Sequence, residues 1–272
     1  MDAREFFDKL WQDYTCLTPQ AEIIYRAFCE RNGSVRNDHV AFRTFDISPV
    51  NLESLEPLLW GLGYKRHRQY QFKQKKLSAW GYIHDDAKLP LVFFSELLVE
   101  QLSEPAQTII QRLVGNVDEQ QLKTPAVFWS GRLWPALSWQ EYQLLLQESE
   151  YAAWLAALGF HANHFTIAVH HLAVDNSIEK AISVVKDCQY PLNEAGGEIK
   201  GEPADFLVQA STLADQVLMP FADGDEHQIS TCYYEFAQRY REEGGQYYAG
   251  FVAANADKIF ESTNRFQRQG RL

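Results

Sequence analysis

The sequence has few cysteines, and none is placed for a thiol-based metal or redox motif. Cys16, Cys29, Cys188 and Cys232 are scattered over 272 residues without any Cys-x-x-Cys spacing. Zinc ribbons and redox dithiols need that spacing, and a disulfide framework needs more closely set cysteines. We therefore expect four free thiols and a reducing compartment.

Long apolar runs are missing as well. No stretch approaches the roughly 18 apolar residues that are needed to cross a bilayer. The first five residues, Met1 to Glu5, lack the basic and then apolar regions of a signal peptide. These features predict a cytoplasmic protein with no membrane partner.

An excess of positive charge is also missing. The chain has 25 basic and 36 acidic residues and a formal net charge of −11, whereas binding to a phosphate backbone needs clustered Lys and Arg. One basic run at 65–76 alternates with Tyr70 and Phe72, which is typical of a solvated strand face. We predict no nucleic-acid partner, and the sequence does not indicate an oligomeric state.

The most informative feature that is present is a repeated local pattern. Segments 37–43 and 162–168 each place a histidine, His39 or His164, after polar residues and at the start of an alternating apolar stretch. Each histidine opens a predicted strand, helix and three strands, so the chain contains two βαβββ modules. Two such modules can pair their curved sheets into one open barrel around a shared cavity.

We therefore predict an α+β fold in one domain with added helices. The predicted parts are a domain over 1–272, a first module at 37–100, a helical connection at 101–160, a second module at 161–240, and a C-terminal helix and tail at 241–272.

Local signals place the individual elements. Thr18-Pro19 begins a helix that Asn32-Gly33 ends, and Ser138 to Glu141 have the form of a capping box. Asn176 is expected to cap a helix that runs through Val185. Strands are expected at 39–45, 91–97, 164–169, 197–200, 206–210 and 229–236, and a helix at 252–260, after which the Arg/Gln-rich end should fray.

Two histidines and one carboxylate are candidates for a metal site. His39, His164 and Glu235 each lie in a different predicted strand. If the faces that bear them point inward, the three side chains meet in the cavity. They form the ligand set of a non-haem Fe(II) facial triad, which leaves positions for a bidentate oxygen substrate and O₂. Fe(II) or Mn(II) is the expected ion, and Zn(II) or Ni(II) could replace it in purified protein.

Arg43 shares the predicted face of His39. Four strand residues separate the two by roughly 13 Å of rise, and the long side chain can reach part of the way back. Its guanidinium is suited to a bidentate grip on a substrate carboxylate. A metal at one end and Arg43 at the other indicate a short dicarboxylate, although Arg43 could instead pair with Asp38 or Asp46.

Each candidate has a structural alternative. A histidine at a strand start often serves the fold alone, and Glu235 could be a solvated edge carboxylate. Other residues compete for the ligand roles, with Glu96 as a possible fourth ligand. The competing histidines are His67, His84, His161, His170, His171 and His227.

Four segments resemble the 2-oxoadipate dioxygenase/decarboxylase family, which has the vicinal-oxygen-chelate fold. The segments are 38–45, 163–166, 201–203 together with 209–212, and 234–239, in the family's order. The chain is similar to a short form of the family, whose better-understood members are longer.

The resemblance implies Fe(II), O₂ and conversion of 2-oxoadipate to 2-hydroxyglutarate with loss of CO₂, a step in lysine breakdown. It places the metal ligands at His39, His164 and Glu235, the substrate carboxylate at Arg43, and further substrate contacts at Gln209 and Ser211. Two other functions stay open: a glyoxalase-like lyase or isomerase, and a non-catalytic small-molecule binding protein.

Overall fold

The computed structural model describes residues 1–263. The α-helices in this part of the chain are α1 (Ala3–Leu17), α2 (Pro19–Asn32), α3 (Leu52–Gly61), α4 (Glu104–Val114), α5 (Trp139–Glu148), α6 (Glu150–Leu158), α7 (Ile178–Asp187) and α8 (Ala253–Ile259). The strands are β1 (Asn37–Phe45), β2 (Lys65–Phe72), β3 (Leu77–Ile83), β4 (Leu91–Leu97), β5 (Ala162–Ala168), β6 (Leu207–Ser211), β7 (Gln216–Pro220), β8 (Glu226–Ser230) and β9 (Tyr233–Arg239). Across residues 1–263, none of the helices has the length and apolar content to span a bilayer.

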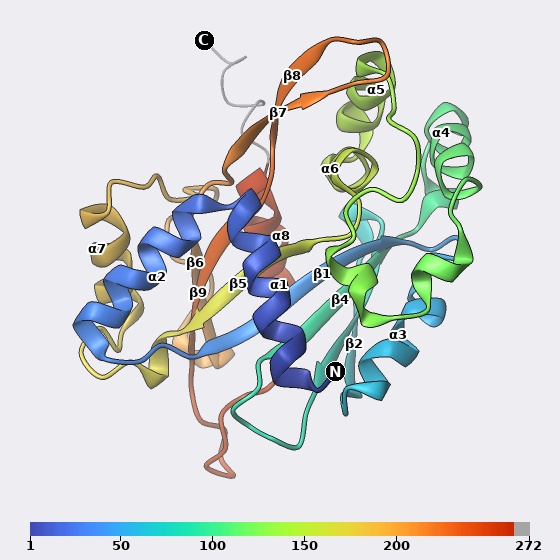
Figure 1. Cartoon of the computed structure of the whole chain (residues 1–272). Helices are drawn as coiled ribbons and strands as arrows, with labels where there is room; N and C mark the ends of the chain where they lie inside the picture. The colour runs from blue at the N-terminus through green and yellow to red at the C-terminus, as the bar shows by residue number, and fades with distance from the viewer. Residues whose placement is uncertain (264–272) are drawn as a thin grey trace.

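Seven strands form one curled sheet in the order β2-β3-β4-β1-β5-β9-β6 (Figure 1). In the first module β1 pairs with β4 in parallel, and in the second β5 pairs with β9 in parallel. The two modules meet where β1 pairs with β5 in antiparallel fashion, with Ala41 opposite His164. The prediction of an α+β fold with paired βαβββ-like modules in an open barrel is confirmed.

The second module differs from the prediction at two places. Residues 197–200 form no strand, and only Lys200 makes an isolated bridge to Gln209. Gly197 in this segment, and Gly196 and Gly201 on either side of it, have positive φ angles, which turn the chain away from an extended path. The predicted strand at 229–236 is divided into β8, which pairs with β7 outside the main sheet, and β9.

The two faces of the sheet have different coverings. Phe165 on β5 contacts Trp11 and Tyr14 of α1, with ring centroids 5.1 and 5.0 Å apart. His164 points to the opposite face, where Ile259 of α8 helps to enclose it. Figure 1 shows α1 and α8 on opposite sides of the sheet. The predicted alternation along the histidine-bearing strands is thus confirmed, with the polar side chains under α8.

Helix capping matches the sequence signals in α5 but differs from them in α2 and α7. Ser138 and Glu141 form the predicted capping box at the start of α5. Ser177, rather than Asn176, caps α7, because its side chain accepts a hydrogen bond from the Lys180 amide. Pro19 occupies the first turn of α2, but Thr18 makes no side-chain cap.

Three further expectations concern the surface, the thiols and the end of the chain. Residues 65–72 of the basic run form β2, where Tyr70 and Phe72 are the buried residues, as predicted, and Lys73 to Lys75 form a 3₁₀ turn. All four cysteines are free. The predicted C-terminal helix is α8, and the Arg/Gln-rich end that was expected to fray lies outside the described residues.

Candidate metal centre

The three predicted ligands come together on the face of the sheet that α8 covers. One ligand atom from each of His39, His164 and Glu235 lies within 4.8 Å of the others, and all three residues are buried. His39 lies near the start of β1, His164 in β5, and Glu235 in β9, two strands to one side of β1. Because the sheet is curled and the side chains of each strand alternate between its faces, three side chains that are distant in sequence come together.

The spacing of the donor atoms fits a single metal ion. His164 Nε2 lies 3.3 Å from His39 Nε2 and 3.3 Å from Glu235 Oε2, and His39 Nε2 lies 3.5 Å from Glu235 Oε1. Donors that sit about 2.1 Å from one ion at right angles are about 3.0 Å apart. Two imidazoles and a carboxylate on one side of such an ion leave its other positions open.

Neighbouring side chains fix the orientation of both imidazoles. His39 donates from Nδ1 to Asp38 Oδ1 at 2.7 Å, and His164 donates from Nδ1 to Asn163 Oδ1 at 3.2 Å. Both Nε2 atoms therefore face the centre with their lone pairs, the arrangement found around metal-bound histidines. Gln209 Nε2 donates to Glu235 Oε1 at 2.5 Å and holds the carboxylate.

Asp38 is itself held by an arginine from the other module. Arg239 donates from Nε to Asp38 Oδ2 and from Nη2 to Oδ1, both at 2.8 Å. Burial raises the pKa of Asp38, but Arg239 and His39 lower it by more, so the net shift is downward. Asp38 is thus an ionised carboxylate that links β1 to β9 directly beside the predicted ligands.

The electrostatics keep His164 in the protonation state that a metal needs, whereas burial acts against ionisation of Glu235 when no cation is bound. Burial, followed by the charges of His39 and Arg43, holds the pKa of His164 well below its usual value, so the imidazole is neutral. Burial raises the pKa of Glu235, while His39 and Gln209 act in the opposite direction. A cation at the centre would favour the ionised carboxylate, since opposite charge lowers a carboxyl pKa.

Arg43 is close enough to the centre for its charge to act on His164, but it is paired with a residue that the sequence did not suggest. Its Nη1 donates to Glu150 Oε1 at 2.9 Å, so the expected alternatives, Asp38 and Asp46, are wrong. Asp38 is held by Arg239, and Asp46 accepts a hydrogen bond from the Val99 amide. Arg43 is 3% exposed, and its Nε and Nη2 have no hydrogen-bond partner within residues 1–263.

A small cavity adjoins the predicted ligands. It has a volume of about 20 Å³, enough for about one water molecule. Gln209 and Tyr233 contribute to its polar wall, and Phe251, Ile259 and Phe260 close it from the side of α8.

Ser211 and the competing residues lie elsewhere. Ser211 is opposite Glu235 in the strand register, but its hydroxyl bonds to Ser262 at 2.8 Å and does not line the cavity. Glu96 accepts a hydrogen bond from the Leu52 amide at the start of α3. His161 pairs with Asp13, while His84, His170 and His171 line a different pocket. Neither His67 nor His227 belongs to the metal-competent cluster within residues 1–263.

Comparison with known proteins supplies the family. The sequence model of 2-oxoadipate dioxygenase/decarboxylase matches residues 12–248. The chain belongs to this family. The rice protein named 2-oxoadipate dioxygenase/decarboxylase, chloroplastic/amyloplastic, is 36% identical over an alignment 278 residues long, and this alignment covers 93% of this chain and 76% of the rice protein.

Solved structures agree with this membership of the 2-oxoadipate dioxygenase/decarboxylase family. Rice hydroxyglutarate synthase in complex with 2-oxoadipate superposes with a TM-score of 0.90 at 34% identity, covering 98% of this chain and 95% of the rice chain. A Shewanella frigidimarina protein, provisionally described as a hydrolase, gives 0.89 at 44% identity, covering 93% and 98%. A Ralstonia eutropha protein provisionally placed in the glyoxalase superfamily gives 0.78 at 21% identity, covering 92% and 85%, and supports the fold.

Several residues around the centre of this 2-oxoadipate dioxygenase/decarboxylase family member were not predicted as part of it. Tyr233 stacks on His164 with ring centroids 4.7 Å apart, and its buried hydroxyl has no partner within residues 1–263. Phe251 contacts His39 edge-on at 4.9 Å. Tyr233 could have been identified from the sequence, because alternation along β9 places it on the same face as Glu235. The position of Phe251 could not, because no local signal indicates that the segment around α8 folds back over the sheet.

Proposed function

We propose that this protein is an Fe(II)-dependent dioxygenase/decarboxylase that acts on a short 2-oxo dicarboxylic acid. 2-Oxoadipate and O₂ give 2-hydroxyglutarate and CO₂, so that both oxygen atoms are accounted for in the products. The convergence of His39, His164 and Glu235 in a chain of this family carries the proposal. The rice relative that binds 2-oxoadipate supports the substrate class, and the reaction would serve lysine breakdown.

In this proposal the chain holds the metal and keeps its surroundings dry. His39, His164 and Glu235 bind Fe(II), which supplies a Lewis acid for the 2-oxo acid group and the electrons needed for chemistry with O₂. Asp38 and Asn163 keep the imidazoles in the tautomer with Nε2 directed at the metal. Phe93, Phe251 and Phe260 line the cavity and exclude bulk water from the reacting group.

Arg43 and Tyr233 would bind the distal carboxylate of the substrate. Arg43 keeps two guanidinium nitrogens without partners although its side chain is buried, and a buried donor without an acceptor is costly. Burial, followed by the charge of Glu235, raises the pKa of Tyr233 well above its usual value, so its hydroxyl is a neutral donor. A carboxylate placed between them would satisfy both side chains, while Glu150 holds the remaining guanidinium nitrogen.

The decisive experiment is O₂ uptake by protein loaded with Fe(II) under anaerobic conditions and then given 2-oxoadipate. We expect uptake with stoichiometric release of CO₂ and its loss in His39→Ala and Glu235→Ala. His67→Ala, a histidine on exposed β2, is the matched control and should keep full activity. Absence of uptake with 2-oxoadipate and with shorter and longer 2-oxo acids, despite bound iron, would refute the proposal.

The same assay separates the other two functions. Turnover supported by Zn(II) or Ni(II) without O₂ would indicate a glyoxalase-like lyase or isomerase. Ligand binding that persists unchanged after chelation, without any turnover, would indicate a binding protein. A cytoplasmic location remains a prediction, and the rice relative carries a plastid name.

A further inference from the structure

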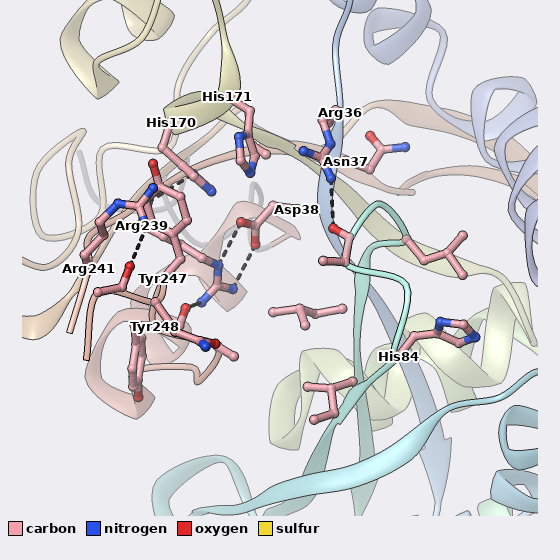
Figure 2. Close-up of a pocket in the computed structure, with 18 of the residues that line it drawn as sticks. Arg36, Asn37, Asp38, His84, His170, His171, Arg239, Arg241, Tyr247 and Tyr248 are labelled. Carbon is pink, nitrogen blue, oxygen red and sulfur yellow. Dashed lines mark hydrogen bonds and ion pairs between the residues drawn. The ribbon is translucent and has the colours of Figure 1, made fainter. Parts of the chain in front are cut away.

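A second and much larger pocket lies where β1 begins and β5 and β9 end (Figure 2). Its volume is about 750 Å³, within the range of small-molecule sites. Leu89 and Leu91 contribute apolar wall, and Tyr247 and Tyr248 contribute aromatic wall. The cavity beside the predicted ligands, at about 20 Å³, is far smaller.

The charged residues that line this pocket are three arginines and one aspartate. Arg239 is bound to Asp38 and to the Tyr248 and Gly250 carbonyls, so it serves the fold. Since Arg239 and Asp38 neutralise each other, these four residues give the lining two positive charges, from Arg36 and Arg241. That charge contrasts with the net charge of −11 of the whole chain.

Arg36 and Arg241 are available to an anion. Arg36 donates to the Ala87 carbonyl at 2.8 Å, and Arg241 donates to the Gly245 carbonyl and lies 4.3 Å from the centre of the Tyr247 ring. Within residues 1–263 neither forms an ion pair with a carboxylate. A guanidinium held only by a carbonyl keeps several donors for a carboxylate.

The two arginines face one space. Figure 2 shows them on different sides of the pocket, with Asp38 and His171 between them. Burial and the charges of Arg36 and Arg241 lower the pKa of His171, while Asp38 acts in the opposite direction, in agreement with this placement of the two arginines. Two separated cations across a pocket suit a ligand with a carboxylate at each end.

The pocket borders the metal centre through a thin wall. Asp38 lines the pocket and accepts the hydrogen bond of His39 on the other side. The guanidinium of Arg239 lies 5.5 Å from the Phe251 ring, which in turn contacts His39. A molecule in the pocket is therefore separated from the predicted ligands by one layer of side chains.

We propose that this pocket is a second binding site, in which Arg36 and Arg241 capture the dianionic dicarboxylic acid before it reaches the metal centre. The identity of the acid rests on the proposed function, whereas the site itself rests on the charges and geometry of the pocket. A cationic cavity in an acidic protein raises the local concentration of a dianion and its rate of association.

The first test is equilibrium binding of adipate, which lacks the 2-oxo group, to metal-free protein by calorimetry. Arg43→Gln removes the proposed carboxylate contact at the metal centre and should leave binding at the pocket intact. The double variant Arg36→Gln/Arg241→Gln should abolish that binding in the Arg43→Gln background. Replacement of both arginines by Lys should restore it in part, and Arg26→Gln, an exposed arginine on α2, should have no effect.

The second test is the salt dependence of turnover of 2-oxoadipate by the iron-loaded enzyme. We expect the double Gln variant to lose about tenfold in kcat/KM at low ionic strength and to become nearly insensitive to salt. Its kcat should stay within about twofold of the wild type, because neither arginine contacts the metal ligands.

The two proposals fail in different ways. If the enzyme turns over 2-oxoadipate but adipate binding and kcat/KM are unchanged in the double Gln variant, the pocket is not a capture site. If adipate binding depends on Arg36 and Arg241 but no O₂ is consumed, the pocket proposal holds and the oxygenase proposal fails.

Discussion

At the scale of single residues, Asp38 connects the predicted metal centre to the second pocket. It accepts hydrogen bonds from His39 on one side and from Arg239 on the other, and it is 7% exposed. A carboxylate that accepts from Nδ1 fixes the histidine tautomer and increases the basicity of Nε2. Asn163 has the corresponding place beside His164, but it is neutral and its contact is longer, at 3.2 Å.

We predict that Asp38→Asn lowers metal affinity by about 10- to 100-fold. The amide cannot hold His39 and Arg239 with two ionised oxygens, so the imidazole is less firmly oriented. Co(II) titration followed by absorbance measures the affinity. Asn163→Ala is the comparison and should have a smaller effect. Equal losses in the two variants would contradict a special role for the charged partner.

We predict that Arg43→Lys impairs activity only for acids with a distal carboxylate. Lysine can keep the charge opposite Glu150 but cannot offer the planar pair of donors that arginine offers. Loss of hydrogen bonds to a charged group should cost about 1.5–3 kcal/mol, or roughly 10- to 100-fold in kcat/KM for 2-oxoadipate. The value for 2-oxohexanoate, which lacks the second carboxylate, should change little. An equal loss for both acids would instead indicate a general effect on the centre.

At the scale of elements, Asp175 joins the end of α2 to the segment that precedes α7. It accepts from Arg31 Nε and Nη2 at 2.9 and 2.8 Å and from Asn32 Nδ2 at 2.8 Å. The Asn32 side chain in turn accepts hydrogen bonds from the Val174 and Asp175 amides. The buried carboxylate of Asp175 therefore connects the end of α2 to the start of α7, the helix of the second module.

We predict that Asp175→Asn lowers the free energy of unfolding by about 1–2 kcal/mol at pH 7, a modest value because Arg31 is half exposed. Hydrogen bonding to Arg31 lowers the pKa of Asp175 below its ordinary 3.8. The carboxylate therefore stabilises the fold at pH values above the ordinary pKa of 3.8. This contribution is lost as the pH falls through the lower pKa of the folded state. Urea unfolding of both proteins from pH 7 to pH 3 should show their difference shrinking below about pH 4. A constant difference would mean that the charge is not responsible.

The elements also show how far sequence patterns reach. Alternation around His39, His164 and Glu235 was sufficient to place three side chains on one face, because strand period fixes which side chains point together. The partner of Arg43 was not accessible in this way. Glu150 lies at the start of α6, in the helical connection, and no local pattern indicates that this connection packs against β1. The predicted strand at 197–200 does not form for a local reason, because Gly196, Gly197 and Gly201 have positive φ angles.

At the scale of the whole molecule, the predicted ligands join the two modules. His39 belongs to β1 of the first module, and His164 and Glu235 belong to β5 and β9 of the second. The antiparallel pairing of β1 with β5 is the seam between the modules. A metal ion held by all three side chains would therefore bind only when that seam is formed, so metal binding and folding are linked.

We predict that a divalent metal raises the melting temperature of the metal-free protein. At a free concentration of about 100 times Kd, linkage adds about 2.7 kcal/mol, which corresponds to roughly 5–10 °C for a chain of this size. Differential scanning calorimetry of the metal-free and Fe(II)-loaded protein under anaerobic conditions measures the shift. His164→Ala should abolish it, because the two remaining ligands come from strands that β5 separates, whereas His67→Ala should retain it. If His164→Ala keeps the full rise in melting temperature, the stabilising metal does not need the ligand from β5. It would then bind outside this centre.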